Sequence, residues 1–352
     1  MISKVALENF RCFQEFTLDG IRPVTLIAGA NNVGKSTMLE SIFLFVGRYT
    51  ADVFSRLNSF RGIQLAELSP QMVWEPLFSN MDTSKNISII VTNNNESQAV
   101  VFSKDDSFSL SSVQEAPLPL NIPGIGTPFA NSYPLKIMYK DTHNDVAHFM
   151  LSVAGISLIP QKPISGVPPH TFYISSRINF PHTLAPELFS IIEIAGNKSK
   201  CVEVLKLLDD RIKDLSVVYI GGVNGIFVDL GLKSKLSINV IGDGVNKLLH
   251  LALVMLAAPG AIILVDEIEN GFHYSFFPKL WEVIGKLASE TNCQVIATSH
   301  SYECINGASA LAVDADLFRF VRFDRKDGVT VPHIFDNDAF SFDEHMGTVL
   351  LC

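Results

Sequence analysis

Short uninterrupted apolar runs divide the chain and predict the buried strands of a parallel sheet. They are PVTLIAG at 23–29, AIILV at 261–265 and CQVIA at 293–297, each of a length that suits one strand. A helix-like stretch that closes at Gly47 follows the first run, and the last two runs are separated by enough chain for one helical crossover. The pattern therefore predicts an α/β fold with a mainly parallel sheet flanked by helices.

Other stretches have the residue composition typical of antiparallel strands and turns. The opening residues 3–18 predict two short strands joined at a turn, and the β-rich runs from Ile87 to about Ser152, with their Asn/Asp clusters, predict an inserted β subdomain. The remaining expected elements are helices over 184–215, strands at 216–231 and 235–242, and an edge hairpin over 318–335 that turns at Lys326, Asp327 and Gly328.

Composition and charge narrow the classes of function. The chain has 352 residues, 47% of them hydrophobic, and a net charge of −9, so a broad basic surface for non-specific DNA binding is not expected. Its five cysteines form no C-x-x-C pair, which is typical of reduced thiols. The start lacks a signal-peptide layout, and the longest apolar run, 248–265, is broken at Pro259 and Gly260. We therefore expect a cytoplasmic protein without a membrane partner.

The stretch LIAGANNVGKSTMLESIFLF at 26–45 carries a phosphate-binding pattern. Gly29, Gly34, Lys35 and Ser36 fit G-x-x-x-x-G-K-[ST]. The glycines would let backbone N–H groups approach the phosphates, Lys35 would reach the β- and γ-phosphates, and the Ser36 hydroxyl would ligate Mg²⁺. A Gly/Asn turn with a chance lysine is the plain alternative. The strand before the loop and the helix after it favour the phosphate site.

Two acids end the apolar run at 261–265. In P-loop enzymes an acid at this position holds Mg²⁺ through water, and a neighbouring carboxylate activates the attacking water. Asp266 fits the first role and Glu267 the second. A strand that simply ends in solvated acids is the alternative, and the phosphate loop elsewhere in the chain favours the two-part nucleotide site.

Two further motifs are suited to binding an anion such as phosphate. His300, within Ser299-His300-Ser301, follows a buried strand at the edge where α/β sheets bind ligands, which favours a γ-phosphate sensor over a structural histidine. Gly242, Asp243 and Gly244 open a long apolar helix, where free N–H groups could meet a phosphate. A strand–helix turn is the alternative for this second motif.

The order of these motifs resembles the ATP-binding-cassette (ABC) class of ATPase heads. The opening VALENFRCFQEFTL is similar to the start of SMC-like and RecF-like members. DEIENGFH and TSHS resemble the OLD (overcoming lysogenization defect) family and related AAA-type ATPases of bacterial defence systems. The resemblance covers residues 1–47 and 238–305, and it implies a P-loop NTPase fold of the ABC-ATPase type with ATP and Mg²⁺ as cofactors.

The resemblance also implies a head-to-head dimer, or a higher oligomer, with ATP sandwiched between chains. The residues of one chain that would hold the phosphates are Gly29, Asn32, Gly34, Lys35, Ser36 and Thr37. Those of the other chain that would cap the γ-phosphate are Gly242, Asp243 and Gly244. Arg11 would lie near the nucleotide, and the dimer-facing segment would contain Glu269, Asn270 and His273.

The motifs and the local residue composition together divide the chain into four segments. Residues 1–84 would form the N-terminal part of the ATPase core with the phosphate loop, and 85–170 the inserted β-rich subdomain. Residues 171–237 would form a helical, linking lobe. Residues 238–352 would complete the core with the Gly-Asp-Gly signature, the Asp-Glu strand and the switch histidine.

The chain departs from the related families in several places. OLD proteins carry a C-terminal TOPRIM nuclease domain, whereas only about fifty residues follow Ser301, too few for such a domain. We therefore expect no nuclease activity in this chain and interpret the late acids as a polar tail: Asp336, Asp338, Asp343 and Glu344. The glutamine that follows the signature in transporters is replaced by Val245 and Asn246. Gln71 is a weak candidate for a glutamine loop.

Three functions compete on this basis. The leading hypothesis is an ATP-hydrolysing switch that dimerises on ATP and controls a separate effector, a nuclease or toxin, in bacterial phage defence. The alternative is a RecF- or SMC-like ATP-gated clamp in DNA repair, so DNA remains a candidate partner, with a steep salt dependence. A nucleotide-binding scaffold without turnover is the third, and Lys35, Asp266 and Glu267 argue against it.

Overall fold

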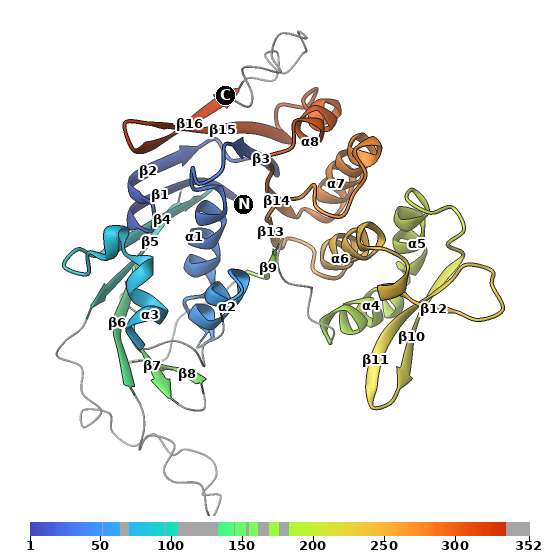
Figure 1. The fold of residues 1–352 in the computed structure, drawn as a ribbon, viewed down its shortest axis with the longest axis horizontal. Coiled ribbons are helices and arrows are strands. Elements are labelled where there is room, and N and C mark those ends of the chain that lie inside the picture. Colours follow the sequence, from blue (N-terminus) through green and yellow to red (C-terminus); the bar gives the residue numbers. More distant parts are fainter. Residues whose placement is uncertain are drawn as a thin grey trace, which may run out of the picture.

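The computed structural model describes most of the chain. The described residues are 1–50, 52–63, 70–94, 96–104, 133–143, 145–152, 155–160, 169–175 and 183–335. They form two large sheets, a small sheet and helices between and around them (Figure 1). Within these residues, no helix is both long enough and apolar enough to cross a membrane.

A six-stranded sheet forms the centre, in the order β16-β15-β3-β14-β13-β9. Its strands are β3 (Val24–Gly29), β9 (Thr171–Ile174), β13 (Ile262–Val265), β14 (Gln294–Thr298), β15 (Phe318–Lys326) and β16 (Val329–Phe335). Neighbouring strands are parallel except for the pair of β15 and β16. This arrangement confirms the predicted buried strands and C-terminal hairpin, whose turn residues Asp327 and Gly328 have φ angles of 51° and 83°.

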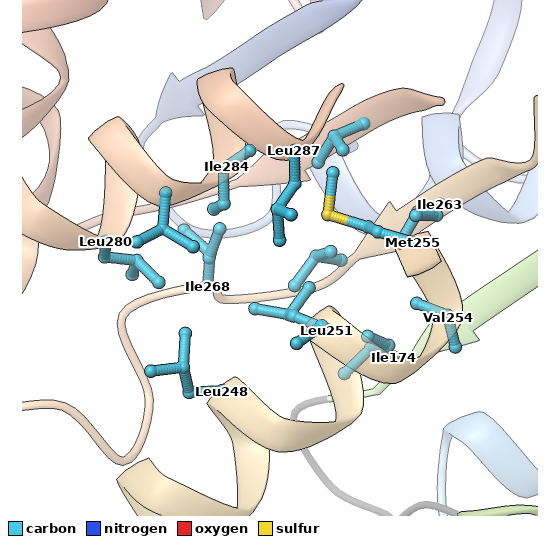
Figure 2. Close-up of a cluster of buried hydrophobic side chains, with 14 of the residues drawn as sticks. Ile174, Leu248, Leu251, Val254, Met255, Ile263, Ile268, Leu280, Ile284 and Leu287 are labelled. Carbon is cyan, nitrogen blue, oxygen red and sulfur yellow. The ribbon is translucent and has the colours of Figure 1, made fainter. Parts of the chain in front are cut away.

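The central sheet is buried on both faces, which explains why its strands are continuously apolar. On β13, Ile263 and Val265 belong to the core shared with α6 (Asp243–Ala257) and α7 (Phe277–Thr291), whereas Ile262 and Leu264 belong to the core shared with α1 (Lys35–Gly47). Figure 2 shows Ile263 among side chains of α6 and α7. The helix after the phosphate loop and the helix after the Gly-Asp-Gly signature therefore cover opposite faces.

A seven-stranded antiparallel sheet covers α1 from the other side, in the order β2-β1-β4-β5-β6-β7-β8. Its strands are β1 (Ile2–Phe10), β2 (Phe13–Asp19), β4 (Ile87–Asn93), β5 (Glu96–Lys104), β6 (Tyr133–Asp141), β7 (Val146–Ser152) and β8 (Gly155–Pro160). The two predicted opening strands pair with each other, and β1 also pairs with β4. The sheet thus combines strands from the predicted segments 1–84 and 85–170, and the four-segment division stays a prediction.

Shorter elements complete the fold. They are α2 (Val53–Phe60), α3 (Pro70–Trp74), α4 (Leu184–Ile194), α5 (Lys198–Lys206), α8 (Tyr302–Gly307), β10 (Asp214–Ile220), β11 (Val223–Asp229) and β12 (Leu236–Ser237). The predicted helical stretch 184–215 is two helices, because the chain turns at Gly196 with a φ of 73°. The prediction is wrong after Lys206, where α5 ends, and β10 already begins at Asp214. The predicted strand 235–242 is wrong beyond Ser237, because a 3₁₀ turn and Gly242, with φ 148°, lead directly into α6.

Candidate functional site

The phosphate loop joins the end of β3 to the start of α1, as the motif predicts. Gly29 has a φ of 137°, and a Cβ atom there would lie 2.3 Å from the Phe323 carbonyl oxygen. Gly34 has a φ of 100°, and its Cβ atom would lie 2.6 Å from the Phe13 ring. Both conformation and space therefore require glycine at these positions.

The start of α1 presents the donors expected at a phosphate site. No side chain caps this helix, so its first N–H groups are available to an anion. Asn32 adopts the left-handed conformation within the loop, with a φ of 64°. The Lys35 ammonium donates to the carbonyl oxygens of Gly29 and Ala30 at 2.7 and 2.8 Å. The buried Thr37 side chain contacts the thiol of Cys12.

Asp266 joins the two halves of the predicted nucleotide site. Its Oδ1 atom accepts hydrogen bonds from the hydroxyls of Ser36 and Thr298, each at 2.8 Å. Burial raises the pKa of Asp266, and these two hydrogen bonds oppose the rise. A hydroxyl and a carboxylate are the hard oxygen ligands that Mg²⁺ prefers, so Ser36 and Asp266 fit the predicted metal site.

Glu267 is held in a strained backbone conformation by contacts on all sides. Its φ is 49°, which is uncommon for a residue with a long side chain. Its N–H donates to Thr298 Oγ1 at 2.9 Å, and its carbonyl oxygen accepts from Lys247 Nζ at 2.8 Å. Asn270 Nδ2 donates to its carboxylate at 2.8 Å. These contacts fix the orientation of the Glu267 side chain at the end of the strand.

Thr298 is therefore expected to be essential for the site, and we predict that Thr298→Val destabilises the protein. The valine keeps the shape but leaves the Glu267 N–H without its acceptor, so we expect a loss of about 1–3 kcal/mol in the free energy of unfolding. Urea unfolding measures this loss. Thr291→Val is the matched control, because the buried Thr291 hydroxyl only donates to the Leu287 carbonyl of its own helix. Equal stability of the two variants would contradict the prediction.

Lys247 lies on α6 and contacts the segment after the acids. Desolvation lowers its pKa to about 8, while the carboxylates of Glu269, Glu267 and Asp266 oppose that change. Its ammonium also lies 5.9 Å from the centre of the Phe272 ring. The helix that begins at the Gly-Asp-Gly signature is thereby tied to the carbonyl of Glu267.

The depressed pKa of Lys247 predicts a pH dependence of stability. Between about pH 8 and 10.5 the native lysine loses its proton while the unfolded one keeps it. The unfolded state then binds more protons, so the free energy of unfolding rises with pH across this window. Below the window the native state bears the full cost of burying the charged lysine. We expect a rise on the order of 2 kcal/mol relative to Lys247→Met, measured by urea unfolding at successive pH values. Parallel curves for the two proteins would contradict this.

The Gly-Asp-Gly signature packs on the loop that follows the acids. Gly242 is exposed and precedes α6, and Asp243 is exposed in its first turn. A Cβ atom on Gly244 would lie 2.6 Å from the Gly271 carbonyl oxygen, so this contact requires glycine. Capping of a γ-phosphate by these residues stays a prediction.

Arg11 lies beside the helix of the phosphate loop. It sits in the β1–β2 turn, and its Nε atom is 2.7 Å from the carboxylate of Glu40 on α1. Glu40, only 2% exposed, also accepts two hydrogen bonds from Arg61 at 2.7 and 2.9 Å. The structure therefore shows Arg11 in a buried ion-pair cluster, and its contact with nucleotide stays a prediction.

His300 follows β14, as predicted, and is paired with Glu269. The Glu269 Oε1 atom accepts the His300 backbone N–H at 2.8 Å and lies 3.0 Å from the ring Nδ1 atom. Of the other residues expected in the dimer-facing segment, Asn270 contacts Glu267, and His273 contacts Ser275 at the surface. The side chain of Gln71 and the acids at 336, 338, 343 and 344 lie outside the described residues.

Sequence reasoning missed several of these contacts. Thr298, Lys247 and Glu40 were not singled out, and Glu269 was assigned to a different role. The register of β13 and β14, which pairs Val265 with Ala297, brings Thr298 beside Asp266. Aligning the polar ends of the two apolar runs would have indicated Thr298, whereas no sequence signal distinguishes Lys247 from other helical lysines.

Two protein-family models match the chain. Residues 1–144 match the model of an AAA ATPase domain, and residues 154–306 match an AAA domain described as "putative AbiEii toxin, Type IV TA system". The two matches, each to a model of an AAA-type domain, lie on either side of a short gap.

Two curated proteins are distant relatives. The chain is 23% identical to an ATP/GTP phosphatase of Helicobacter pylori over 325 residues, covering 87% of this chain and 86% of that protein. It is also 23% identical to an OLD nuclease of Thermus scotoductus over 379 aligned positions, covering 97% of this chain. The chain spans only 66% of the length of that nuclease.

The fold prediction is confirmed by a solved structure. An SMC head domain, crystallised with the C-terminal winged-helix domain of ScpA, matches with a TM-score of 0.50 at 14% identity. The match covers 95% of this chain and 97% of that one. The chain has an α/β fold similar to that of this SMC head domain.

Proposed function

We propose that the protein is an ATP-hydrolysing switch that closes into a head-to-head dimer on ATP and thereby controls a separate effector, a nuclease or toxin, in bacterial phage defence. The observation that carries the proposal is the 2.8 Å contact between Ser36 of the phosphate loop and Asp266 of the acidic strand, beside Glu267. Residues far apart in the sequence thus meet, in an arrangement that hydrolysis of a nucleoside triphosphate would require.

The residues of the site support ATP turnover rather than nucleotide binding alone. Lys35 and the N–H groups at the start of α1 would bind the phosphates, and Ser36 and Asp266 would hold the metal ion. Mg²⁺, when bound, neutralises charge on the phosphoryl oxygens. Glu267 would accept the proton of the attacking water, and His300 would donate to the transferred phosphoryl group. The directed Glu267 carboxylate argues against a scaffold without turnover.

The dimer is part of the proposal because α1 and α6, the two helices proposed to bind phosphate, cover opposite faces of the central sheet. The exposed Gly242 and Asp243 would meet the γ-phosphate on another chain, so ATP would become part of an interface. Hydrolysis would then weaken the association, which is how a nucleotide can control a bound partner.

A separate effector is part of the proposal because of what the chain resembles. The likeness to an OLD nuclease and to an AAA domain described with a toxin system supports a nuclease or toxin as the controlled partner.

The test is a pull-down of tagged Glu267→Gln protein from its native host in the presence of ATP. This variant should keep ATP and stay closed, and Lys35→Ala protein serves as the matched control that cannot close. Enrichment of a nuclease or toxin with Glu267→Gln alone would support the switch. Enrichment of DNA and replication proteins would favour the ATP-gated DNA clamp. If no partner is enriched in any nucleotide state, the proposed control of an effector is wrong.

A further inference from the structure

Glu269 is a buried carboxylate in direct contact with the predicted switch histidine. It is 8% exposed, and its Oε1 atom contacts both the backbone N–H and the ring Nδ1 atom of His300. We propose that Glu269 is a positioning residue that orients the His300 ring for ATP hydrolysis. This inference rests on the proposed ATPase function.

The local fold explains why Glu269 meets His300. Ile268 is fully buried, and its N–H donates to the Thr298 carbonyl at 3.0 Å, which attaches the chain after the acids to the end of β14. The Phe272 N–H then donates to the Glu269 carbonyl at 3.2 Å and closes a turn. The side chain between these two bonds is directed toward the residues that follow β14.

The charge of Glu269 is balanced by cations of the nucleotide site. A buried carboxylate is unfavourable unless it is paired, and its Oε2 atom has no hydrogen-bond partner within the described residues. Burial lowers the pKa of Lys35 and of Lys247, and Glu269 is the strongest influence that opposes this in each case. A neutral side chain could accept the His300 N–H equally well, so the backbone contact alone does not explain a charged residue here.

The two ring nitrogens of His300 explain what this contact does. Glu269 Oε1 lies 3.0 Å from Nδ1, so this nitrogen is engaged by the carboxylate. Only Nε2 then remains for a phosphoryl oxygen. Glu269 therefore orients the ring so that Nε2 is the atom available to a nucleotide.

The test is a double-mutant cycle on ATP hydrolysis by the full chain. We expect Glu269→Gln to lower kcat about tenfold or more, the range in which outer carboxylates assist functional histidines, while the affinity for ATP changes little. We expect Glu269→Gln to have no further effect in a His300→Ala background, because it acts through the ring. Glu303→Gln is the matched control: Glu303 lies close to His300 in the sequence but is exposed and contacts Ser301.

Other outcomes have distinct meanings. If the losses from Glu269→Gln and His300→Ala multiply, Glu269 does not act through the histidine and the inference is wrong. If Glu269→Gln melts well below the wild type and loses turnover only in proportion to its loss of folded protein, the carboxylate is structural and the inference is equally wrong. If the wild-type protein hydrolyses no ATP, the proposed function itself fails.

Discussion

Lys35→Ala is expected to raise the dissociation constant for ATP by about 10- to 100-fold. This is the range expected when a charged hydrogen-bond donor to a charged acceptor is removed. The physical reason is that Lys35 is the cation at the phosphate loop, where its ammonium now donates to the carbonyl oxygens of Gly29 and Ala30. Alanine keeps the helix and removes only the charge and the donors. Titration with a fluorescent ATP analogue measures the dissociation constant.

The control for Lys35→Ala is Lys279→Ala, which removes an exposed lysine from the surface of α7. Its ATP affinity should equal that of the wild type, which separates the effect of the loop from that of net charge. An unchanged dissociation constant in Lys35→Ala would reject the assignment of the phosphate loop, and with it the proposed ATPase site.

Glu267→Gln is expected to bind ATP normally and to hydrolyse it more slowly by about 10²-fold or more, the usual contribution of a general base. Glutamine has the same shape, so the backbone contacts with Thr298 and Lys247 should persist. Only the ability to accept a proton from water is lost. Phosphate release and nucleotide binding, measured side by side, separate the two effects.

The same Glu267→Gln variant should accumulate in the ATP-bound dimer, because the step that weakens the interface no longer occurs. Light scattering with ATP and with ADP checks this, and Glu282→Gln, an exposed glutamate on α7, is the matched control. If Glu267→Gln hydrolyses ATP at the wild-type rate, Glu267 is not the general base.

Local sequence was sufficient for the parts of the site that are contiguous in the chain. The phosphate loop needs glycine at Gly29 and Gly34 because their φ values are positive and neighbouring atoms leave no space for a side chain. A pattern of consecutive residues records such local requirements directly. The buried strands were likewise predictable, since a sheet covered on both faces needs continuous apolar runs.

The antiparallel sheet was predictable only in part. Its strands have recognisable β-rich sequences, but the pairing of β1 with β4 joins the N-terminal residues to a strand far along the chain. Hydrophobic periodicity gives the faces of a strand and not its neighbours. The predicted subdomain therefore lacked the two strands at its edge.

The sequence by itself determined the α/β class, the phosphate loop and the acids at the end of an apolar strand. Only the tertiary structure decided which groups hold those acids: Thr298 with Asp266, Lys247 with the carbonyl of Glu267, and Glu269 with His300. Each of these contacts joins residues from different elements. Their meeting depends on strand order, strand register and helix placement, which are set by how the whole core packs and leave no pattern in consecutive residues.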